Sequence, residues 1–153
     1  MSSQMAHIAA LRHEAGYRLD ESVGHLLRRA HQRHVAQFQI RAGDHGLTPP
    51  QFAALLRLVE LGSVTQNRLG RLVAMDPATI QGVVRRLLAR ELVVATRDPM
   101  DRRTVVLSAT ESGRLVADVA SPRAQMANES VLDCLTAEER SKFLAMLRRV
   151  AGA

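Results

Sequence analysis

The fold is decided between Ala74 and Arg90, where the sequence reads AMDPATIQGVVRRLLAR. Asp76 is a good helix N-cap because its carboxylate can accept hydrogen bonds from the free amides of a first turn, and Pro77 suits the position after the cap. Apolar side chains then recur at helical spacing, at Ile80, Val83, Val84, Leu87 and Leu88. The stretch therefore predicts a helix from Asp76 to Arg90 with one face in a core.

The opposite face of this predicted helix is small, polar and positively charged, and no acidic residue occurs before Glu91. A glutamine can read adenine, an arginine can read guanine or hold a phosphate, and a threonine can contact a thymine methyl group or a phosphate. Small residues such as Ala78 and Gly82 would let the helix sink into a groove. The candidates for DNA contact on this face are Thr79, Gln81, Arg85 and Arg86. The alternative interpretation is an ordinary solvated helix face.

A shorter helical pattern, from Gln66 to Val73, precedes this helix and leaves only a tight turn between the two. Two short helices joined in this way, the second of them basic, are typical of a helix-turn-helix. Thr65 can cap the first helix. Thr65, Gln66 and Asn67 are also candidates for phosphate contact, because a helix N-terminus favours an anion. Plain capping is the alternative.

Two strand-like segments follow, Leu92 to Thr96 and Thr104 to Ser108, on either side of a charged turn that reads DPMDRR from Asp98 to Arg103. β-Branched and apolar residues on both sides of such a turn predict a β-hairpin. A hairpin directly after a recognition-type helix is a wing, so the sequence predicts a winged helix-turn-helix. A charged, solvated turn without a partner is the alternative for its tip.

The wing turn and its continuation resemble the MarR family of bacterial winged-helix transcription regulators. The similarity lies in the turn itself, in the Leu-x-x-Thr-x-x-Gly pattern from Leu107 to Gly113, and in LTPPQF from Leu47 to Phe52. The resemblance implies a mainly α fold with a small β-hairpin wing, flanked by long dimerisation helices. It also implies that Asp98 orients an arginine of the wing tip, and that either Arg102 or Arg103 enters the minor groove.

The flanking segments predict further helices. Leu19 to Ala42 should form a long helix capped by Asp20, and Leu47 to Leu61 a second helix opened by a capping box of Thr48 with Gln51. The residues before it, Met1 to Tyr17, are either a loose arm or an arm that stabilises a dimer.

The end of the chain predicts two more helices. Thr110 should cap a long helix that reaches roughly Asp133 and is kinked at Pro122, and Thr136 with Glu139 should open a last one. The terminal helices have more apolar surface than a small winged unit can cover, which suggests a homodimer. We expect one domain over residues 1–153, with a winged DNA-binding unit over 47–109 and dimerisation helices over 18–46 and 110–153.

Composition narrows the class of protein. The 153 residues carry 21 Lys and Arg against 15 Asp and Glu, a formal net charge of +6, which favours a nucleic-acid partner. Aromatic residues are only 3% and Trp is absent, so stacking on single-stranded bases is a poor interpretation. The single cysteine excludes an internal disulfide, and neither a signal peptide nor a membrane-spanning run is apparent. These features predict a soluble, cytoplasmic protein.

An effector site is implied mainly by the resemblance, because many MarR proteins bind phenolic or aromatic acids between the first helix, the second helix and the winged unit. The candidate ligand-binding residues are His25, Arg29 and His31 for a carboxylate, with Phe52, Leu55 and Leu56 as an apolar wall. His25 and His31 lie about 120° apart around a helix, so a shared ligand must bridge two faces. Two alternatives stay open: zinc held by His31 and His34, or histidines on a solvated face.

The sequence contains no nucleophile elbow, glycine-rich phosphate loop, paired catalytic carboxylates or metal triad, so it predicts neither an enzyme nor a bound cofactor. Cys134 is expected to be a buried structural thiol. We expect a homodimeric DNA-binding transcription regulator, a repressor that a small aromatic acid releases from a palindromic operator in double-stranded DNA, with recognition helices about 34 Å apart. The alternative is a winged helix used for protein–protein or RNA contacts.

Overall fold

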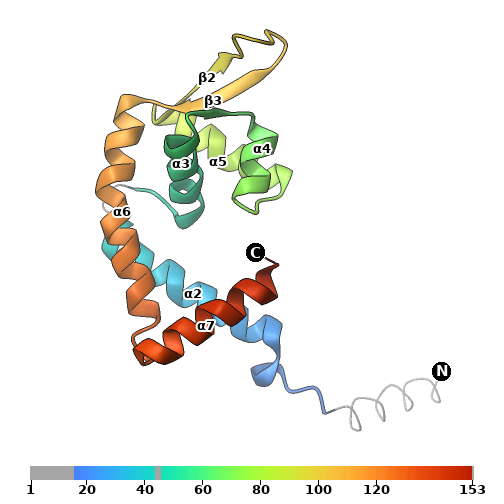
Figure 1. The fold of residues 1–153 in the computed structure, drawn as a ribbon, viewed down its shortest axis with the longest axis vertical. Helices are drawn as coiled ribbons and strands as arrows, with labels where there is room; N and C mark the ends of the chain where they lie inside the picture. The colour runs from blue at the N-terminus through green and yellow to red at the C-terminus, as the bar shows by residue number, and fades with distance from the viewer. Residues whose placement is uncertain (1–15, 44–45, 153) are drawn as a thin grey trace, which may run out of the picture. The chain divides into compact units, whose positions relative to one another are not determined.

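The computed structural model describes residues 16–43 and 46–152 (Figure 1). The arm predicted for Met1 to Tyr17 lies outside the described residues except for its last two. The chain divides into two compact units, and the division falls inside helix α2 (Val23–Ala42), between Arg33 and His34. In the part of the chain that is described, no helix has the length and apolar character needed to cross a membrane.

The first unit contains a short 3-10 turn, η1 (Leu19–Glu21), and the first half of α2. The sequence predicted one helix from Leu19 with Asp20 as its cap, and this prediction is wrong. The Ser22 hydroxyl donates to the Leu19 carbonyl at 2.8 Å and closes η1 before α2 begins. Asp20 lies within η1, and its carboxylate oxygen is 3.6 Å from Nε2 of His25.

The second unit holds the winged helix-turn-helix and confirms the predicted fold class. Its elements are α3 (Pro49–Leu61), β1 (Ser63–Val64), α4 (Gln66–Leu72), α5 (Pro77–Ala89), β2 (Val93–Arg97), β3 (Val105–Ala109), α6 (Glu111–Val131) and α7 (Ala137–Ala151). The capping box of Thr48 with Gln51 opens α3 as predicted. The wing has one strand more than predicted, because β1 pairs antiparallel with β3 and gives the sheet order β1-β3-β2.

The core of this unit is the apolar stripe of α5 packed against α3, α4, α6 and the sheet. Its largest fully buried side chains include Leu55, Leu58, Leu69, Ile80 and Leu87. The predicted stripe of α5 is confirmed except at Leu88, which is 36% exposed at the edge of the stripe.

A second, smaller cluster joins the end of α2 to α6 through Phe38, Ala42, Ala124 and Ala127. Phe52 of α3 packs against both clusters, and its ring centroid is 5.6 Å from that of Phe38. One side chain of α3 therefore belongs to both apolar clusters of the second unit.

Helix α6 begins in close contact with the base of the wing. Thr110 caps the helix as predicted: its hydroxyl accepts from the Gly113 amide at 3.0 Å, and its own amide donates to the Leu92 carbonyl at 3.1 Å. A Cβ atom at Gly113 would stand 2.0 Å from the Leu92 carbonyl oxygen. Only glycine fits there, which explains the last position of the Leu-x-x-Thr-x-x-Gly pattern. The helix then runs without interruption through Pro122.

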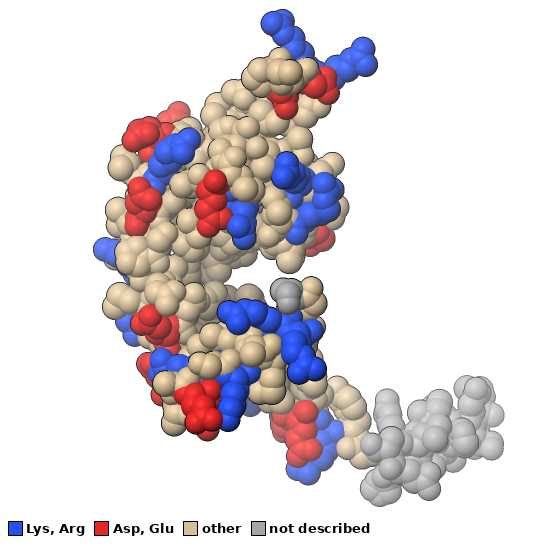
Figure 2. All heavy atoms as spheres, in the orientation of Figure 1, with Lys and Arg blue, Asp and Glu red and all other residues tan. Residues whose placement is uncertain are grey.

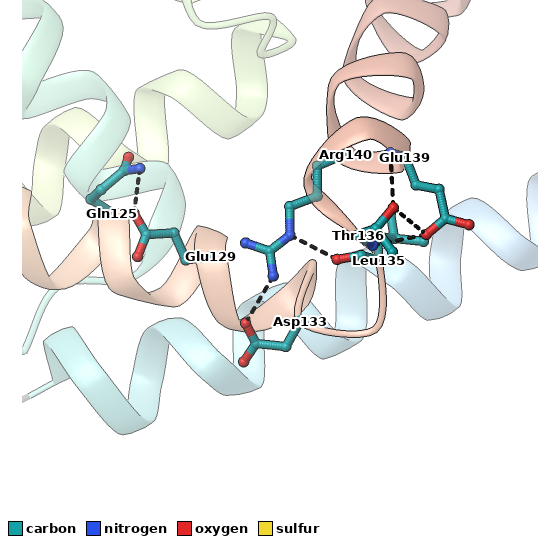
Figure 3. Close-up of polar contacts among 7 residues, drawn as sticks. All are labelled: Gln125, Glu129, Asp133, Leu135, Thr136, Glu139 and Arg140. Carbon is teal, nitrogen blue, oxygen red and sulfur yellow. Dashed lines mark hydrogen bonds and ion pairs between the residues drawn. The ribbon is translucent and has the colours of Figure 1, made fainter.

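Polar contacts fix the corner between α6 and α7 (Figure 3). Thr136 and Glu139 form the predicted capping box, and hydrogen bonds from Thr136 hold the pKa of Glu139 below its ordinary value. The Arg140 guanidinium donates to the Leu135 carbonyl at 3.0 Å and reaches the Asp133 carboxylate at 3.4 Å. Cys134 is exposed in this corner, so the prediction of a buried thiol is wrong.

Candidate nucleic-acid interface

The turn between α4 and α5 is closed by backbone hydrogen bonds rather than by glycine. Ala74 adopts a left-handed φ of 53°, and the Met75 amide donates to the Gly70 carbonyl at 2.9 Å. Gly70 lets the two helices approach closely, because a Cβ atom there would be 3.1 Å from Cγ2 of Ile80 and 3.2 Å from the Met75 carbonyl oxygen. The relative orientation of α4 and α5 is therefore fixed by close packing.

Asp76 caps the recognition helix α5 as predicted. One carboxylate oxygen accepts from the amides of Ala78 and Thr79, at 3.0 and 2.9 Å, and the other accepts from the Thr79 hydroxyl at 2.5 Å. These bonds, the one from the Thr79 hydroxyl first, lower the pKa of Asp76 below its ordinary value. The hydroxyl proton of Thr79 is thereby committed to the cap, which leaves its methyl group and oxygen lone pairs for a contact.

The predicted DNA-facing side chains of α5 share one exposed face. Thr79, Gln81, Arg85 and Arg86 are all exposed, while Gly82 between them is half-buried. Arg86 bends back along the helix, so that a Cβ atom at Gly82 would lie 3.6 Å from one of its guanidinium nitrogens. Within residues 16–43 and 46–152, no carboxylate forms an ion pair with Arg85 or Arg86. Their charge is therefore available to a polyanion.

Helix α4 contributes more cations than the sequence analysis singled out. Thr65 is its cap and accepts from the Arg68 amide at 3.4 Å, and its contact with phosphate stays a prediction. Gln66 is half-buried and Asn67 exposed. Arg68 and Arg71, exposed on the same helix, were not predicted as site residues. Figure 2 shows basic side chains gathered over α4. Their spacing of three residues, which puts both on one helix face, was the available signal.

The wing tip is ordered by its aspartates in a way that the resemblance did not imply. Asp98 accepts from the Met100 amide at 2.8 Å, and Asp101 accepts from the Arg103 amide at 3.0 Å and from the Thr104 hydroxyl at 2.8 Å. Both carboxylates thus bond to the turn itself, and in the described residues neither pairs with a wing arginine. The bond from Thr104 is the main cause of a lowered pKa at Asp101.

The arginines of the wing extend away from this framework. Arg102 and Arg103 are exposed and have no ion-pair partner among the described residues. The hairpin protrudes beyond the helices of its unit, with basic side chains at its end (Figures 1 and 2). A protruding hairpin with unpaired cations next to a basic helix can contact a double helix at two places.

The candidate effector residues fall into both units. In the first unit, the His25 side chain is 15% exposed with Nδ1 unpartnered, whereas Arg29 and His31 are exposed. In the second unit, Phe52 and Leu56 line a pocket of about 230 Å³ between α3 and α4. Leu55 does not line it, because its side chain is fully buried in the core. The described residues contain no group of three or more His, Cys, Asp or Glu that could hold a metal ion.

The pocket between α3 and α4 also contains a charged pair that the sequence analysis missed. Arg57 lies on its wall and binds the Glu60 carboxylate at 2.7 Å, one helical turn away. The remaining wall is apolar, with Ala53, Leu72 and Val73. A cavity of about 150 Å³ accommodates benzene in another protein, so this pocket has room for one aromatic ring.

The fold and this interface define a winged helix-turn-helix protein of the kind that binds double-stranded DNA. A family model described as MarR family matches residues 45–104. The chain is 46% identical to the HTH-type transcriptional repressor NicR of Pseudomonas putida over 134 residues, 88% of this chain and 85% of NicR.

Two solved structures are also similar. BpsR of Bordetella bronchiseptica, described as regulated in its DNA binding by 6-hydroxynicotinic acid, has a TM-score of 0.83 and 39% identity, over 90% of this chain and 98% of BpsR. PcaV of Streptomyces coelicolor, in complex with its natural ligand, has a TM-score of 0.81 and 35% identity, over 90% of this chain and 96% of PcaV. The chain belongs to the MarR family, and it is a DNA-binding transcription regulator rather than an enzyme.

Proposed function

We propose that this protein is a homodimeric repressor that binds a palindromic operator and is released by a small aromatic acid. The observation that carries the DNA-binding part is the exposed cationic face of α5 beside a wing tip with Arg102 and Arg103. Among the described residues, no carboxylate forms an ion pair with the arginines of this face or of the tip. Relatives named as a repressor and as regulated by 6-hydroxynicotinic acid support repression and release by an aromatic acid. Such a regulator would act in the cytoplasm.

The site map assigns different tasks to α5 and to the wing. Gln81 and Arg85 would read base edges in the major groove, with Thr79 and Arg86 beside them, while Arg102 or Arg103 would enter the flanking minor groove. Thr65, Gln66 and Asn67 at the start of α4 would contact the phosphate backbone. Asp98 would act by shaping the wing turn rather than by touching DNA.

Fluorescence anisotropy on a duplex selected by the parent protein tests this map. Arg85→Ala should weaken binding to the preferred sequence by about 1–3 kcal/mol and relax the base preference at one position. Arg102→Ala should weaken binding to all sequences alike and reduce the salt dependence of binding. Arg33→Ala removes an exposed arginine outside the winged unit and should bind as the parent does. The map is wrong if Arg85→Ala and Arg102→Ala both behave like Arg33→Ala.

The homodimer is proposed from apolar surface that the single chain leaves uncovered. Helix α7 has no buried residue, and its exposed apolar side chains are Phe143, Leu144, Met146 and Val150. Helix α2 likewise exposes Val23, Leu26 and Leu27. Leu144→Asp should raise the fraction of monomer in sedimentation equilibrium. Met100→Asp, a change of equal chemistry at the exposed wing tip, should not, and equal effects would contradict the assignment.

The effector would place its ring in the pocket between α3 and α4. Phe52 and Leu56 supply an apolar wall, and Arg57 supplies a cation that a carboxylate could share with Glu60. His25, Arg29 and His31 lie in the first unit, and we keep them as a separate candidate site for a carboxylate.

A thermal-shift titration with 6-hydroxynicotinic acid, followed by DNA release, tests the pocket. Ala53→Leu should fill part of the pocket and weaken ligand binding while the affinity for DNA is kept. If the ligand binds this variant as it binds the parent, the pocket is not its site. Unchanged ligand affinity after replacement of both His25 and His31 would remove those residues from the proposal.

Sequence preference in DNA binding distinguishes the proposed function from that of a protein- or RNA-binding winged helix. A sequence-specific regulator should prefer its selected duplex over heparin and over random duplex by orders of magnitude. Equal affinity for all three polyanions would favour the alternative.

A further inference from the structure

An apolar side chain occupies the tip of the wing, where solvent would favour a polar one. Met100 is 94% exposed, more than any other large apolar side chain in the described part of the chain. Pro99 beside it is also exposed. Single exposed apolar residues are common on protein surfaces, so exposure alone carries no conclusion. At this position, the hydrogen bonding of the surrounding loop is the further observation.

The loop holds Met100 in a fixed position. The Met100 amide donates to the Asp98 carboxylate at 2.8 Å, and the Asp98 amide donates to the Thr104 carbonyl at 2.9 Å. On the other side, Asp101 accepts from Arg103 and Thr104, and the Arg97 guanidinium reaches the Arg103 carbonyl at 3.4 Å. A loop ordered before binding loses less conformational entropy when it docks.

Two carboxylates flank the tip, and their negative charge would oppose contact with DNA. The same hydrogen bonds reduce this effect. Each aspartate accepts hydrogen bonds from N–H or O–H groups of the turn, and these donors partly offset its negative charge. The exposed side chains of the tip that do not bond to the turn are therefore Pro99, Met100, Arg102 and Arg103: two apolar and two cationic. This combination matches proteins that hold the minor groove with arginine and insert an apolar side chain between base pairs.

We propose that Met100 is an apolar wedge that enters the minor groove and partly unstacks one base step of the operator. Methionine suits this task because it is unbranched and polarizable and adapts to an irregular gap. The step would be a flexible pyrimidine–purine step, which costs least to unstack. The inference rests on the proposed contact of the wing with the minor groove.

Three replacements at this position, where the side chain is 94% exposed, should leave the fold intact and separate shape from polarity. Met100→Leu keeps an apolar wedge, Met100→Gln keeps the length but adds an amide, and Met100→Ala removes the wedge. On the duplex selected by the parent protein, the Gln and Ala variants should bind roughly tenfold more weakly and the Leu variant nearly as the parent. The salt dependence should not change in any of them, because no charge is lost.

A direct reading of the base step completes the test. With 2-aminopurine at the flexible step of the flank, the parent and Met100→Leu should raise its fluorescence on binding, and Met100→Ala should not. The wedge is refuted if the Gln and Ala variants bind the duplex as the parent does. It is also refuted if they bind more weakly but raise the 2-aminopurine fluorescence as much as the parent does.

The double variant Arg102→Ala with Arg103→Ala tests the underlying wing contact. If it binds like the parent and keeps its salt dependence, the wing contact fails and the wedge fails with it. If it binds more weakly while the Met100 variants do not, only the wedge fails.

Discussion

Gly113 gives the sharpest test of how the wing is attached to α6. A Cβ atom there would stand 2.0 Å from the carbonyl oxygen of Leu92, 3.0 Å from its carbonyl carbon and 3.3 Å from Cδ1 of Leu55. The nearest obstacle is backbone, and Leu92 is only 3% exposed, so no side-chain rotation can relieve the contact. Gly113→Ala must push the first turn of α6 away from the wing base by roughly 1 Å or more to reach an ordinary separation.

The cost follows from that shift. Overpacking of this kind typically costs 1–3 kcal/mol, and the shift also weakens the hydrogen bonds that join Thr110 to Leu92 and to Gly113, each of which contributes about 1 kcal/mol. Alanine recovers about 1 kcal/mol of helix propensity. We expect the free energy of unfolding to fall by about 3 kcal/mol, which lowers Tm by about 6–12 °C in a chain of this size.

Urea unfolding followed by circular dichroism, at one fixed protein concentration, measures this loss. Gly24→Ala is the matched control, because Gly24 lies in a helix and a Cβ atom there meets nothing within 4 Å. Gly70→Ala should fall between the two, since its closest contacts are 3.1 and 3.2 Å. If the free energy of unfolding of Gly113→Ala matched that of Gly24→Ala, the close approach of α6 to Leu92 would be refuted.

Three further predictions concern the helix caps and the DNA face. Gly82→Ala should stabilise the fold slightly, by about 0.5–1 kcal/mol, yet weaken DNA binding in an anisotropy titration, because the added methyl group lies on the proposed contact face; stronger binding would contradict that orientation. The contribution of Asp76 to stability should be complete above its ordinary pKa and be lost as pH falls through the lowered pKa of the folded state. Asp76→Asn keeps a cap that does not titrate, so its acid-unfolding curve should be shallower than that of the parent; identical curves would exclude Asp76 as a contributor. Thr136→Ala should cost about 0.5–2 kcal/mol in thermal unfolding by breaking the capping box with Glu139, and a smaller loss in Thr136→Ser would show that the hydroxyl is what matters.

Sequence patterns predicted the parts of this fold that depend on neighbouring residues. The caps at Asp76 and Thr136 are local, since the cap and the amides it accepts from are two or three residues apart. The buried stripe of α5 and the hairpin likewise follow from short repeats. The family resemblance added the order of the helices and the wing.

The features that were missed depend on contacts between distant parts of the chain. Strand β1 has only two residues, and its pairing with Ser108 and Leu107 cannot be read from Ser63 and Val64. Periodicity placed Leu55 on the apolar side of α3 but could not tell the core from the pocket wall beside it.

Errors in turns have a similar physical cause. Asp20 is a good capping residue, but the Ser22 hydroxyl closes a 3-10 turn that moves the helix start to Val23. Alanine is not a residue type that signals a left-handed backbone. Ala74 adopts one in a turn that the hydrogen bond from the Met75 amide to the Gly70 carbonyl closes. Cys134 lies between Leu132 and Leu135 in the sequence, yet the corner it occupies faces solvent.

The tight junction at Gly113 makes α6 a lever. Its 21 residues span roughly 31 Å, so a tilt of about 5° around its far end moves its first turn by roughly 2.7 Å. Because that turn is locked to Leu92, the recognition helix and the wing must travel with it. DNA advances about 3.4 Å per base pair, so in the proposed homodimer a rotation of a few degrees would move the two recognition helices out of register with their half-sites. In the proposed mechanism, an effector would need to cause only a small rotation to release the operator.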